Sequence, residues 1–466
     1  MSIFIYNSLT RKKEEFIPLN PPKINIYTCG VTVYDESHIG HARSLYIFDV
    51  IRRYLKYRGF EVKFVRNITD IDDKIINRAN ELKISWQDLV KKYIDRYNED
   101  LETLGIAKGD FEPRATENIP DMIKYIESLI AKGYAYETDG DVYFSVRKFT
   151  EYGKLSGQSI DQMEKGVRIE PSELKKDHLD FALWKKSKEN EPSWGSPWGQ
   201  GRPGWHIECS VMSQKFLKTD TLDIHAGGRD LIFPHHENEI AQAEAVTGKP
   251  FAKYWIHHGL LTINGQKMSK SLGNFITIKK FIEKYDDINL LKLFFLSAHY
   301  SHPIDYTDEK IEEAKQALER IVILFDKIER KAQGSGFRAQ GKEIKEIDEI
   351  KNRFIAAMDD DFNMPQGLAA IFELVNLANK NIDDLPFIAE TKDTLNELLD
   401  IFAVVLKKEK KITGISDEEI KRKIAEREAA RKNKDFSLSD KIRKELEAKG
   451  IILEDTKEGT IWRRRL

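Results

Sequence analysis

The sequence predicts a multidomain α/β protein, with a parallel β-sheet in its N-terminal part and helices toward its C-terminus. Three observations support this fold class. The 466 residues exceed what one ordinary hydrophobic core accommodates. The chain opens with a strand–loop–helix–strand order that is typical of parallel sheets. From Asp308 onward, apolar residues recur every three or four positions, which indicates helices with one buried face.

The parallel sheet is predicted from alternating and continuous apolar runs. The first strand, helix and second strand are expected at residues 23–28, 40–58 and 61–65. Returning strands are expected at residues 222–225 and 256–262. Because ligands of parallel sheets bind beyond the carboxyl ends of the strands, Cys29 and the loop after it should lie at the binding edge.

The segment from about residue 111 to 201 has a different pattern and is interpreted as an insertion between two halves of the sheet. Short strand-like stretches such as 141–145 alternate there with helical ones, and the Gly- and Pro-rich stretch Trp194–Gly204 is expected to be a loop. A helical bundle is expected up to about residue 406. Its first apolar stripe consists of Ile311, Ala314, Leu318, Ile321, Phe325 and Ile328.

Charge and composition bound the class of protein without identifying it. Lys and Arg number 75 and Asp and Glu 77, so the formal net charge of −2 neither indicates nor excludes a nucleic-acid partner. No apolar run is long enough to cross a bilayer, and the first residues lack the pattern of a signal peptide. We therefore expect a cytoplasmic protein without membrane contact, in which the two cysteines form no structural disulfide.

The first motif with chemical meaning is His38-Ile39-Gly40-His41, at the start of the predicted helix. Free backbone N–H groups and the helix dipole favour a phosphate at such a place, and Gly40 lets a flat base or ribose approach the backbone. Taken alone, the motif is equally compatible with two surface histidines.

The second motif is Lys267-Met268-Ser269-Lys270-Ser271, with glycines on both sides that suggest a mobile loop. Lys267 and Lys270 can bring positive charge to a departing pyrophosphate. The alternative is a solvated, charged turn.

A third group combines ligands suited to zinc. Cys29, Cys209, His235 and Glu239 offer two thiolates, an imidazole and a carboxylate, and His235 and Glu239 are expected one turn apart on a helix. The spacing is not that of a zinc finger. Competing imidazoles, which the sequence does not rank, are His236, His257 and His258.

The two nucleotide-binding motifs, in this order, resemble those of class I aminoacyl-tRNA synthetases. Segments around the third group are similar to those of the cysteinyl-tRNA synthetase family, and the similarity continues to the C-terminus. These segments are Thr28–His41, Asn67–Lys74, Gly204–Cys209 and Phe233–Glu239.

The resemblance implies a Rossmann-like catalytic domain in two halves, followed by a helical bundle and a small mixed module. The implied domains are the catalytic halves 1–110 and 202–300, a connective insertion at 111–201, a stem-contact region and bundle at 301–406, and an anticodon-binding module at 412–466. A charged stretch, Lys407–Lys411, would link the last two.

The resemblance also implies a reaction. ATP, bound with Mg²⁺, would activate L-cysteine as its adenylate, and the cysteine would pass to the 3′ end of tRNA(Cys). The residues that would stabilise the transition state are His38, His41 and Lys270, with Lys267 assisting. ATP would be bound by His38, His41 and Lys270 together with Gly40 and Gly227. The cysteine pocket or ribose site would include Thr69, Trp205, His225 and Asp230.

In the family, one Zn²⁺ per chain is held by residues that match Cys29, Cys209, His235 and Glu239. Zinc binds a thiolate strongly and an alcohol poorly, so it would select cysteine over serine. Candidate anticodon contacts, by the same resemblance, are Arg431, Asp440, Asp455 and Trp462. A monomer is expected.

Other interpretations remain open at this point. A ligase that joins cysteine to an amino sugar would share the catalytic half. It would lack the full tRNA-reading C-terminal module that residues 412–466 are expected to form here. A non-catalytic RNA-binding paralogue would be expected to lose the motif histidines and lysines. A side activity that makes cysteine persulfide with a pyridoxal cofactor would use Lys74 or Lys270. The carboxylates Asp70, Asp72 and Asp73 suggest a first helical turn more than a metal cluster.

Overall fold

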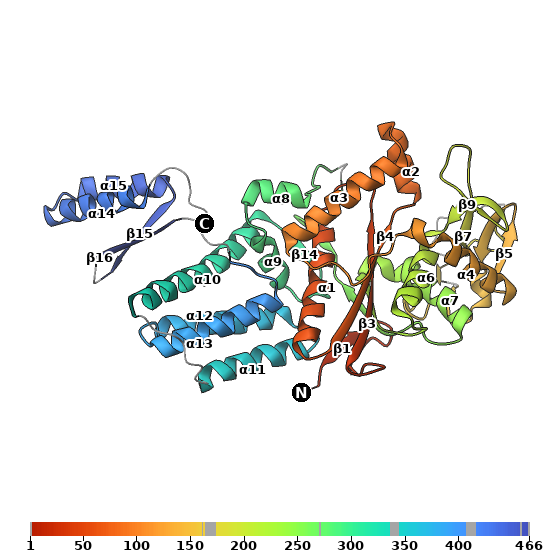
Figure 1. Ribbon diagram of the computed structural model, residues 1–466, viewed down its shortest axis with the longest axis horizontal. Helices are drawn as coiled ribbons and strands as arrows, with labels where there is room; N and C mark the ends of the chain where they lie inside the picture. Colours follow the sequence, from red (N-terminus) through yellow and green to blue (C-terminus); the bar gives the residue numbers. More distant parts are fainter. Residues whose placement is uncertain are drawn as a thin grey trace. The chain divides into compact units, whose positions relative to one another are not determined.

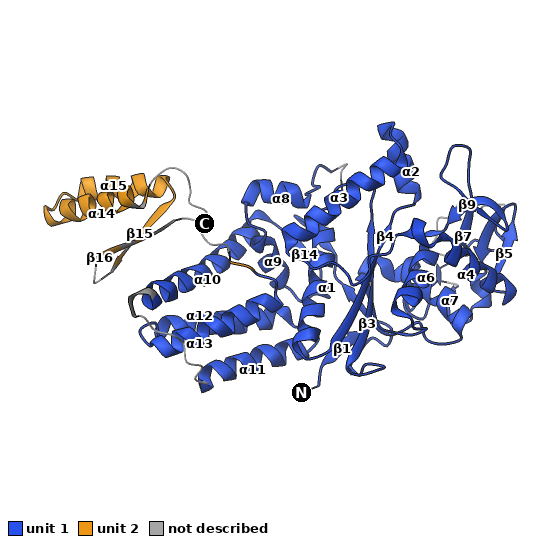
Figure 2. Ribbon diagram, viewed as in Figure 1, with its two compact units in different colours: residues 1–404 blue, residues 405–466 orange. Residues whose placement is uncertain are grey.

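The computed structural model describes residues 2–160, 162–163, 174–269, 272–335, 344–406, 416–456 and 459–464. The chain divides into two compact units, residues 1–404 and 405–466 (Figure 2). The stretch Lys407–Lys411, expected as a linker, lies outside the described residues. Over the described part of the chain, no helix combines the length and the apolar character that crossing a membrane requires.

A four-stranded parallel sheet lies at the centre of the first unit, in the order β11–β10–β3–β4 (Figure 1). Helix α1 joins β3 to β4, and α7 joins β10 to β11, so the two halves of the chain each supply a β–α–β unit. This confirms the predicted Rossmann-like sheet. The bounds are Lys23–Thr32 for β3, Ile39–Tyr57 for α1, Glu61–Thr69 for β4, Leu222–Gly228 for β10, Glu237–Thr247 for α7 and Ala252–His258 for β11.

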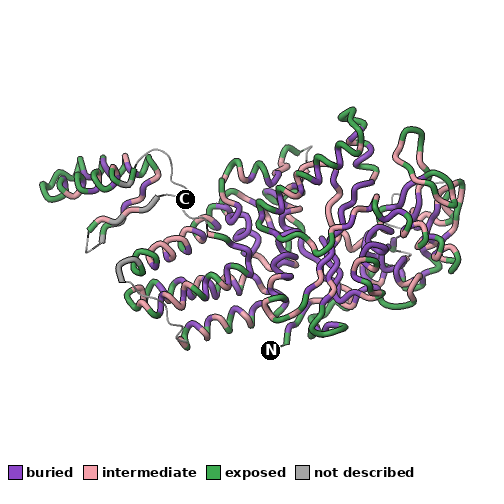
Figure 3. The backbone as a smooth tube through the Cα atoms, in the orientation of Figure 1, coloured by how far each residue is buried: buried purple, intermediate pink, exposed green. Residues whose placement is uncertain are grey.

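Burial explains the composition of the central strands. Every residue of β10 is buried, including Asp223 and His225, as expected for a parallel sheet covered on both faces. Figure 3 shows that buried backbone gathers in the central part of the first unit. The predicted strand 256–262 is wrong as a single element, since β11 ends at His258 and a separate strand, β12 (Leu261–Ile263), follows. The chain turns at Gly259, where a Cβ would lie only 2.1 Å from the carbonyl oxygen of His302.

The insertion is a separate layer built on a five-stranded antiparallel sheet, in the order β5–β6–β7–β9–β8. Helix α6 follows directly and returns the chain to the central sheet, with η1, α4 and η2 completing this region. The bounds are Ala115–Asn118 for η1, Ile119–Ala131 for α4, Ala135–Thr138 for β5, Asp141–Phe144 for β6, Val146–Lys148 for η2, Phe181–Lys186 for β7, Trp194–Ser196 for β8, Gly199–Pro203 for β9 and Trp205–Leu217 for α6.

The Gly-rich stretch after Trp194, expected as a loop, is instead the hairpin β8–β9. Its glycines are used for close packing. A Cβ at Gly201 would lie 2.3 Å from the indole nitrogen of Trp184, so only glycine fits beneath that ring. Gly199, at φ +106°, adopts the positive φ that the turn needs.

The remaining elements of the first unit surround the sheet. Figure 1 shows the helical bundle on one side of the sheet and the insertion on the other. A short sheet in the order β13–β12–β14 is formed by residues that follow β11 and precede α10 in the chain. The bounds are Phe4–Asn7 for β1, Lys12–Glu15 for β2, Asp73–Leu82 for α2, Trp86–Leu104 for α3, Arg229–Leu231 for η3, Ile232–His236 for η4, Gln266–Lys267 for β13, Ile278–Tyr285 for α8, Asn289–Leu296 for α9, Ile304–Tyr306 for β14, Asp308–Ser335 for α10, Lys345–Asp359 for α11, Met364–Lys380 for α12 and Leu385–Ile401 for α13.

The bundle is fastened to α1 by hydrogen bonds from tyrosines. Tyr46 Oη donates to the carbonyl of Phe402 at 2.6 Å, and Tyr54 Oη to Asp359 at 2.6 Å. The predicted apolar stripe of α10 is buried at five of its six positions, while Leu324 is buried in place of the partly exposed Phe325. Helix α1, which starts within the His38-Ile39-Gly40-His41 motif, is therefore held in place against the bundle.

The second unit is a small mixed module with its own core. It contains α14 (Asp417–Lys432), α15 (Phe436–Ala448) and the hairpin of β15 (Ile451–Thr456) and β16 (Gly459–Arg464). Trp462 packs against its buried core, which consists of Ile420, Ile424, Ile442, Leu446, Ile451 and Leu453.

Candidate functional site

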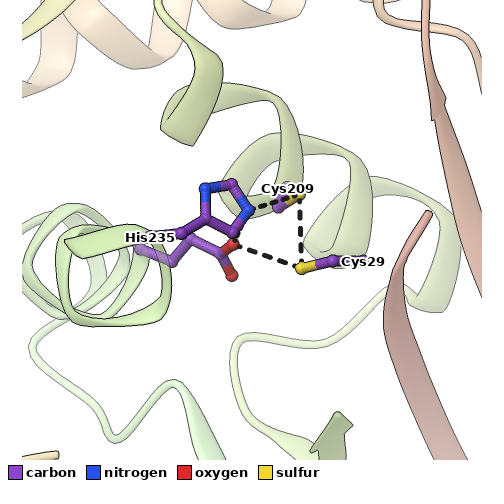
Figure 4. Close-up of side chains that lie close together, drawn as sticks. Cys29, Cys209 and His235 are labelled. Carbon is purple, nitrogen blue, oxygen red and sulfur yellow. Dashed lines mark hydrogen bonds and ion pairs between the residues drawn. The ribbon is translucent and has the colours of Figure 1, made fainter. Parts of the chain in front are cut away.

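Four side chains from three distant parts of the sequence meet at the carboxyl end of β3. Cys29 lies in β3, Cys209 in α6, His235 in η4 and Glu239 one helical turn later in α7 (Figure 4). One ligand atom from each lies within 4.8 Å of the other three, and all but Cys29 are buried. The sequence-predicted metal ligands therefore form one cluster.

The distances within this cluster fit a tetrahedral zinc ion. Bond lengths of about 2.3 Å to sulfur and about 2.0–2.1 Å to nitrogen or oxygen separate ligand atoms by about 3.8 Å for two sulfurs and about 3.5–3.6 Å for sulfur with nitrogen or oxygen. The structure has 3.8 Å for Cys29 with Cys209, 3.6 Å for Cys209 with His235, and 3.5 Å for Cys29 with Glu239. His235 and Glu239, at 2.7 Å, are closer than a bound ion would hold them.

A second set, Cys29, His225, His236 and Glu239, also lies within 4.8 Å. The two contacts that its histidines make both have hydrogen-bond lengths: 2.5 Å from His225 Nε2 to Glu239 Oε2 and 3.2 Å from His236 Nε2 to the sulfur of Cys29. The geometry thus favours the first set as ligands and makes His225 and His236 their hydrogen-bond partners.

Electrostatics at the cluster favour a cation. Burial raises the pKa of Glu239, but His225 and His235 outweigh it and hold that pKa well below its usual range. Burial likewise acts against a charged Cys209, yet its contacts with Cys29 and His235 lower the thiol pKa. Burial raises the pKa of Cys29, and Cys209 raises it further. A divalent ion would compensate the negative charge of Glu239 and Cys209 and would favour the thiolate form of Cys29.

Two of the three residues between His235 and Glu239, namely Glu237 and Asn238, hold the insertion. Glu237 accepts the backbone N–H groups of Gly153 at 2.9 Å and Ser156 at 2.8 Å. Tyr152 Oη donates to the side chain of Asn238. The sequence analysis assigned no role to these two residues, because their partners lie more than 80 positions away.

The nucleotide motifs border a pocket of about 400 Å³ that also reaches the cluster. Residues from α1, η3 and β13 line it, together with Cys29. A volume of this size suits a small-molecule ligand. The lining includes the predicted residues His38, Gly40, His41, Asp230 and Lys267.

His38 and His41 form a capping box at the start of α1. The Nδ1 of His38 accepts the backbone N–H groups of Gly40 at 3.0 Å and His41 at 3.2 Å, and the Nδ1 of His41 accepts that of His38 at 3.3 Å. The rings stack with centroids 3.7 Å apart. Because each Nδ1 is an acceptor, the ring proton of each lies on Nε2.

Both imidazoles are neutral near pH 7. Burial lowers the pKa of His38 to about 4, and burial together with His38 and Lys74 lowers that of His41 to about 3. They are therefore available as neutral hydrogen-bond donors, which the sequence analysis did not specify.

Of the second motif, Lys267 ends β13, while Lys270 lies outside the described residues. The turn before it, Asn264-Gly265, has positive φ at both positions, as a tight hairpin requires. Asn274 closes the following loop, accepting from the N–H of Ser269 at 2.8 Å and donating to the carbonyl of Lys267 at 3.2 Å.

The residues predicted for the cysteine pocket lie in different surroundings. Trp205 is 39% exposed and stacks on His235 with ring centroids 4.0 Å apart. Thr69 is buried and donates to Glu208 at 2.7 Å. His225 is fully buried against Glu239, and Gly227 faces the His236 ring, which a Cβ would meet at 2.8 Å.

The three neighbouring carboxylates each have a separate partner and form no cluster. Asp72 is the N-cap of α2 and accepts the N–H of Lys74. Asp70 is buried and accepts two hydrogen bonds from Thr116, whereas Asp73 pairs with Lys185 of the insertion. This agrees with the interpretation as carboxylates at a helix start.

In the second unit, the predicted anticodon residues are partly engaged with one another. Arg427 contacts both oxygens of Asp455, at 2.7 and 2.9 Å, and Arg431 contacts one at 3.0 Å. These arginines hold the pKa of Asp455 well below its usual range. Phe436, for which the sequence pattern gave no signal, is 63% exposed and lies one turn before the exposed Asp440. An exposed aromatic ring suits base stacking.

Comparison with known proteins agrees with this arrangement. Residues 15–316 match the model of the class I tRNA synthetase (C) catalytic domain, and residues 353–407 match that of the DALR domain. The chain is 52% identical to the cysteine–tRNA ligase of Anoxybacillus flavithermus over 470 residues, covering 100% of both chains. It is 48% identical to that of Clostridioides difficile over 467 residues, covering 99% of each.

Solved structures support the fold at low sequence identity. Mycobacterium tuberculosis methionyl-tRNA synthetase, in complex with methionyl-adenylate, superposes with a TM-score of 0.61 at 16% identity, covering 82% of this chain and 90% of that one. The LeuRS of Agrobacterium radiobacter K84, in a ternary complex with tRNA and LeuAMS, gives 0.61 at 12%, covering 83% and 85%.

Proposed function

The chain belongs to the cysteine–tRNA ligases, a family of class I aminoacyl-tRNA synthetases, and from this premise we propose how its residues carry out each part of the reaction. Cysteine is activated with ATP to cysteinyl-adenylate and pyrophosphate, and then passes to the 3′ end of tRNA(Cys). One observation carries the proposal: a single pocket is lined by the stacked His38 and His41, by Lys267 and by Cys29 of the ligand cluster.

In the activation step, a carboxylate oxygen of cysteine attacks the α-phosphorus of ATP, and the bond to the departing pyrophosphate breaks. The Nε2–H groups of His38 and His41 donate to the phosphate oxygens on which charge accumulates. Lys267, with Lys270, neutralises the pyrophosphate, which leaves with its Mg²⁺. No side chain needs to act as a base, because the attacking carboxylate is already ionised.

Selection of cysteine falls to the ligand cluster. Cys29, Cys209, His235 and Glu239 would hold a zinc ion, which supplies a preference for a thiolate over an alcohol. The exposed face of Trp205, stacked on His235, offers an apolar wall beside the substrate sulfur. His225 contacts Oε2 of Glu239, so that Oε1 of Glu239 faces the other ligand atoms.

The test of this function is cysteine-dependent ATP–pyrophosphate exchange, with serine as the control amino acid. We expect exchange with cysteine only, a fall of at least about tenfold after chelation, and recovery with zinc. Equal exchange with serine, or exchange that survives complete removal of metal, would contradict selection by zinc. Binding of tRNA without any exchange would indicate a non-catalytic paralogue.

The second unit is proposed to read the anticodon, through Arg431, Asp440, Asp455 and Trp462, with Phe436 added from its exposure. Since Asp455 already binds both Arg427 and Arg431, we expect Phe436 to contact a base most directly. Phe436→Ala should raise the KM for tRNA about tenfold or more, because a stacked base contributes about 1–3 kcal/mol.

The exchange reaction serves as the internal control for this variant, because it needs no tRNA and should be unchanged. Leu438→Ala, a neighbouring partly exposed apolar residue on α15, is the matched surface control. An unchanged KM for tRNA in Phe436→Ala would exclude Phe436 from the interface.

A further inference from the structure

Outside the ligand cluster, the side chains of His236, His257 and Ser8 form a continuous row of polar contacts. The row leads from the sulfur of Cys29 toward the surface. His236 Nε2 lies 3.2 Å from the sulfur of Cys29. His236 Nδ1 lies 2.8 Å from His257 Nε2, and His257 Nδ1 lies 2.8 Å from the hydroxyl of Ser8. Ser8 belongs to the turn after β1, more than 20 residues before the first ligand, and it is half-buried.

The backbone around Ser8 fixes the outer end of this row. The N–H of Ser8 donates to the carbonyl of Trp255 at 2.9 Å, two residues before His257 on β11. Asn7 accepts the N–H of Trp255 at 3.1 Å and donates to the carbonyl of Lys253 at 3.0 Å. The N-terminal hairpin is therefore held in register on the strand that carries His257.

The inner end is fixed by packing. His236 and His257 are both buried, and the absence of a side chain at Gly227 makes room for the His236 ring. Burial lowers the pKa of His257 to about 3, so its ring is neutral and carries one N–H. A neutral imidazole in such a row donates from one nitrogen and accepts at the other.

Only one arrangement of hydrogens satisfies every contact when Cys29 is a thiolate ligand. A thiolate has no proton to give, so His236 must donate from Nε2 and accept at Nδ1. His257 must then donate from Nε2 and accept at Nδ1, and that last acceptor requires the hydroxyl hydrogen of Ser8.

We propose that Ser8 is a positioning residue for the metal cluster: its hydroxyl, through His257 and His236, fixes the hydrogen bond that the Cys29 sulfur accepts. The proposal rests on the zinc site of the proposed function. No group in the row changes its protonation state. The N–H···S contact orients the sulfur and disperses its negative charge, as hydrogen-bond partners of metal ligands commonly do.

Without the Ser8 hydroxyl, the row can reverse its hydrogens. The His257 Nδ1–H would then point outward, and a lone pair of His236 Nε2 would face the thiolate of Cys29. We expect Ser8→Ala to weaken zinc binding about tenfold, at the lower end of the range for partners of ligands. Ser8→Thr keeps the hydroxyl and should bind zinc as the wild type does.

The experiment measures two properties of the intact chain. The zinc dissociation constant is determined by competition with a chromogenic chelator, and the thiolate-to-cobalt charge-transfer band is recorded after cobalt substitution. Ser8→Ala should shift that band, because a sulfur that loses a hydrogen bond donates charge more readily. Ser301→Ala is the matched control, since Ser301 also contacts a histidine, His299 Nδ1 at 2.9 Å, away from the cluster.

The outcomes separate this inference from the proposed function. If Ser8→Ala leaves both the zinc constant and the cobalt band unchanged while the wild type shows a thiolate band, the Ser8 proposal is overturned and the zinc site stands. If the wild type shows no thiolate–cobalt band, the Ser8 proposal and the proposed zinc site are both overturned. A urea-unfolding midpoint of Ser8→Ala close to that of Ser301→Ala excludes general unfolding as the cause of weaker binding.

Discussion

Replacing His38 with alanine or asparagine should lower cysteine-dependent exchange about 100- to 1,000-fold, the loss that follows removal of one well-placed donor to a charged transition state. The two variants differ in stability. His38 is the N-cap of α1 and accepts the N–H groups of Gly40 and His41. Asparagine retains a capping acceptor, whereas alanine should cost about 1 kcal/mol of unfolding free energy.

Urea unfolding and pyrophosphate exchange on the same two variants separate capping from catalysis. If His38→Asn retained nearly wild-type exchange, His38 would act only through the helix cap. Ser85→Ala, which removes the N-cap hydrogen bond of α3 to Asp88, is the control for lost capping away from the pocket.

The pH dependence of stability follows from the same histidines. Their folded-state pKa values, about 4 for His38 and about 3 for His41, lie below the ordinary value of 6.5. The unfolded chain therefore binds more protons below about pH 6.5, and the stability due to these rings is lost as the pH falls from there toward about 4 for His38 and about 3 for His41. His38→Asn should reduce this loss between pH 6.5 and 4.

The sequence was sufficient for the parts of the fold that local patterns determine. The β3–α1–β4 unit has a ten-residue strand, a helix that is buried on most of its sides and a second buried strand, so its type and order were predictable. The hairpin β8–β9 was not predictable, because its glycines suggest a loop. Their role in packing becomes apparent only from the position of the Trp184 ring against Gly201 in the fold.

The clustering of the four proposed ligands was predictable, whereas their hydrogen-bond partners were not. His235 and Glu239 share a helical face by spacing alone, but the choice between His235 and His236 depends on which ring faces Cys209 and which faces His257. His225 was expected near the substrate, and only the packing of β10 against α7 directs its ring to Glu239. Such contacts join segments with no periodic relation in the sequence.

Arg43, two residues after His41, is the second position at which a large effect is expected. Its guanidinium is fully buried and donates to four backbone carbonyls: Gly259 at 2.7 Å, Leu260 at 2.9 Å, Tyr300 at 3.2 Å and His302 at 2.6 Å. Burial lowers the pKa of Arg43 to about 10, so it stays protonated near pH 7. It thereby ties α1 to the turn before β12 and to the residues before β14.

Arg43→Met should lose about 2–4 kcal/mol of unfolding free energy, because several buried carbonyls lose a charged donor. That is a large share of the roughly 5–15 kcal/mol that stabilises a domain. Arg43→Lys should recover part of it, since an ammonium group reaches fewer of the four acceptors. Equilibrium unfolding in urea measures both.

Exchange kinetics then distinguish a general loss of stability from a loss of alignment between the two nucleotide motifs. Arg43 connects the helix of His41 to the hairpin of Lys267, so Arg43→Lys should lower kcat more than it raises the KM for ATP, even where the chain is fully folded. Arg52→Met is the matched control on α1, because Arg52 is also buried but donates to Lys108 at 2.7 Å, away from that hairpin. Equal losses of kcat in the folded Arg43 and Arg52 variants would show that Arg43 supports the helix alone and does not align the motifs.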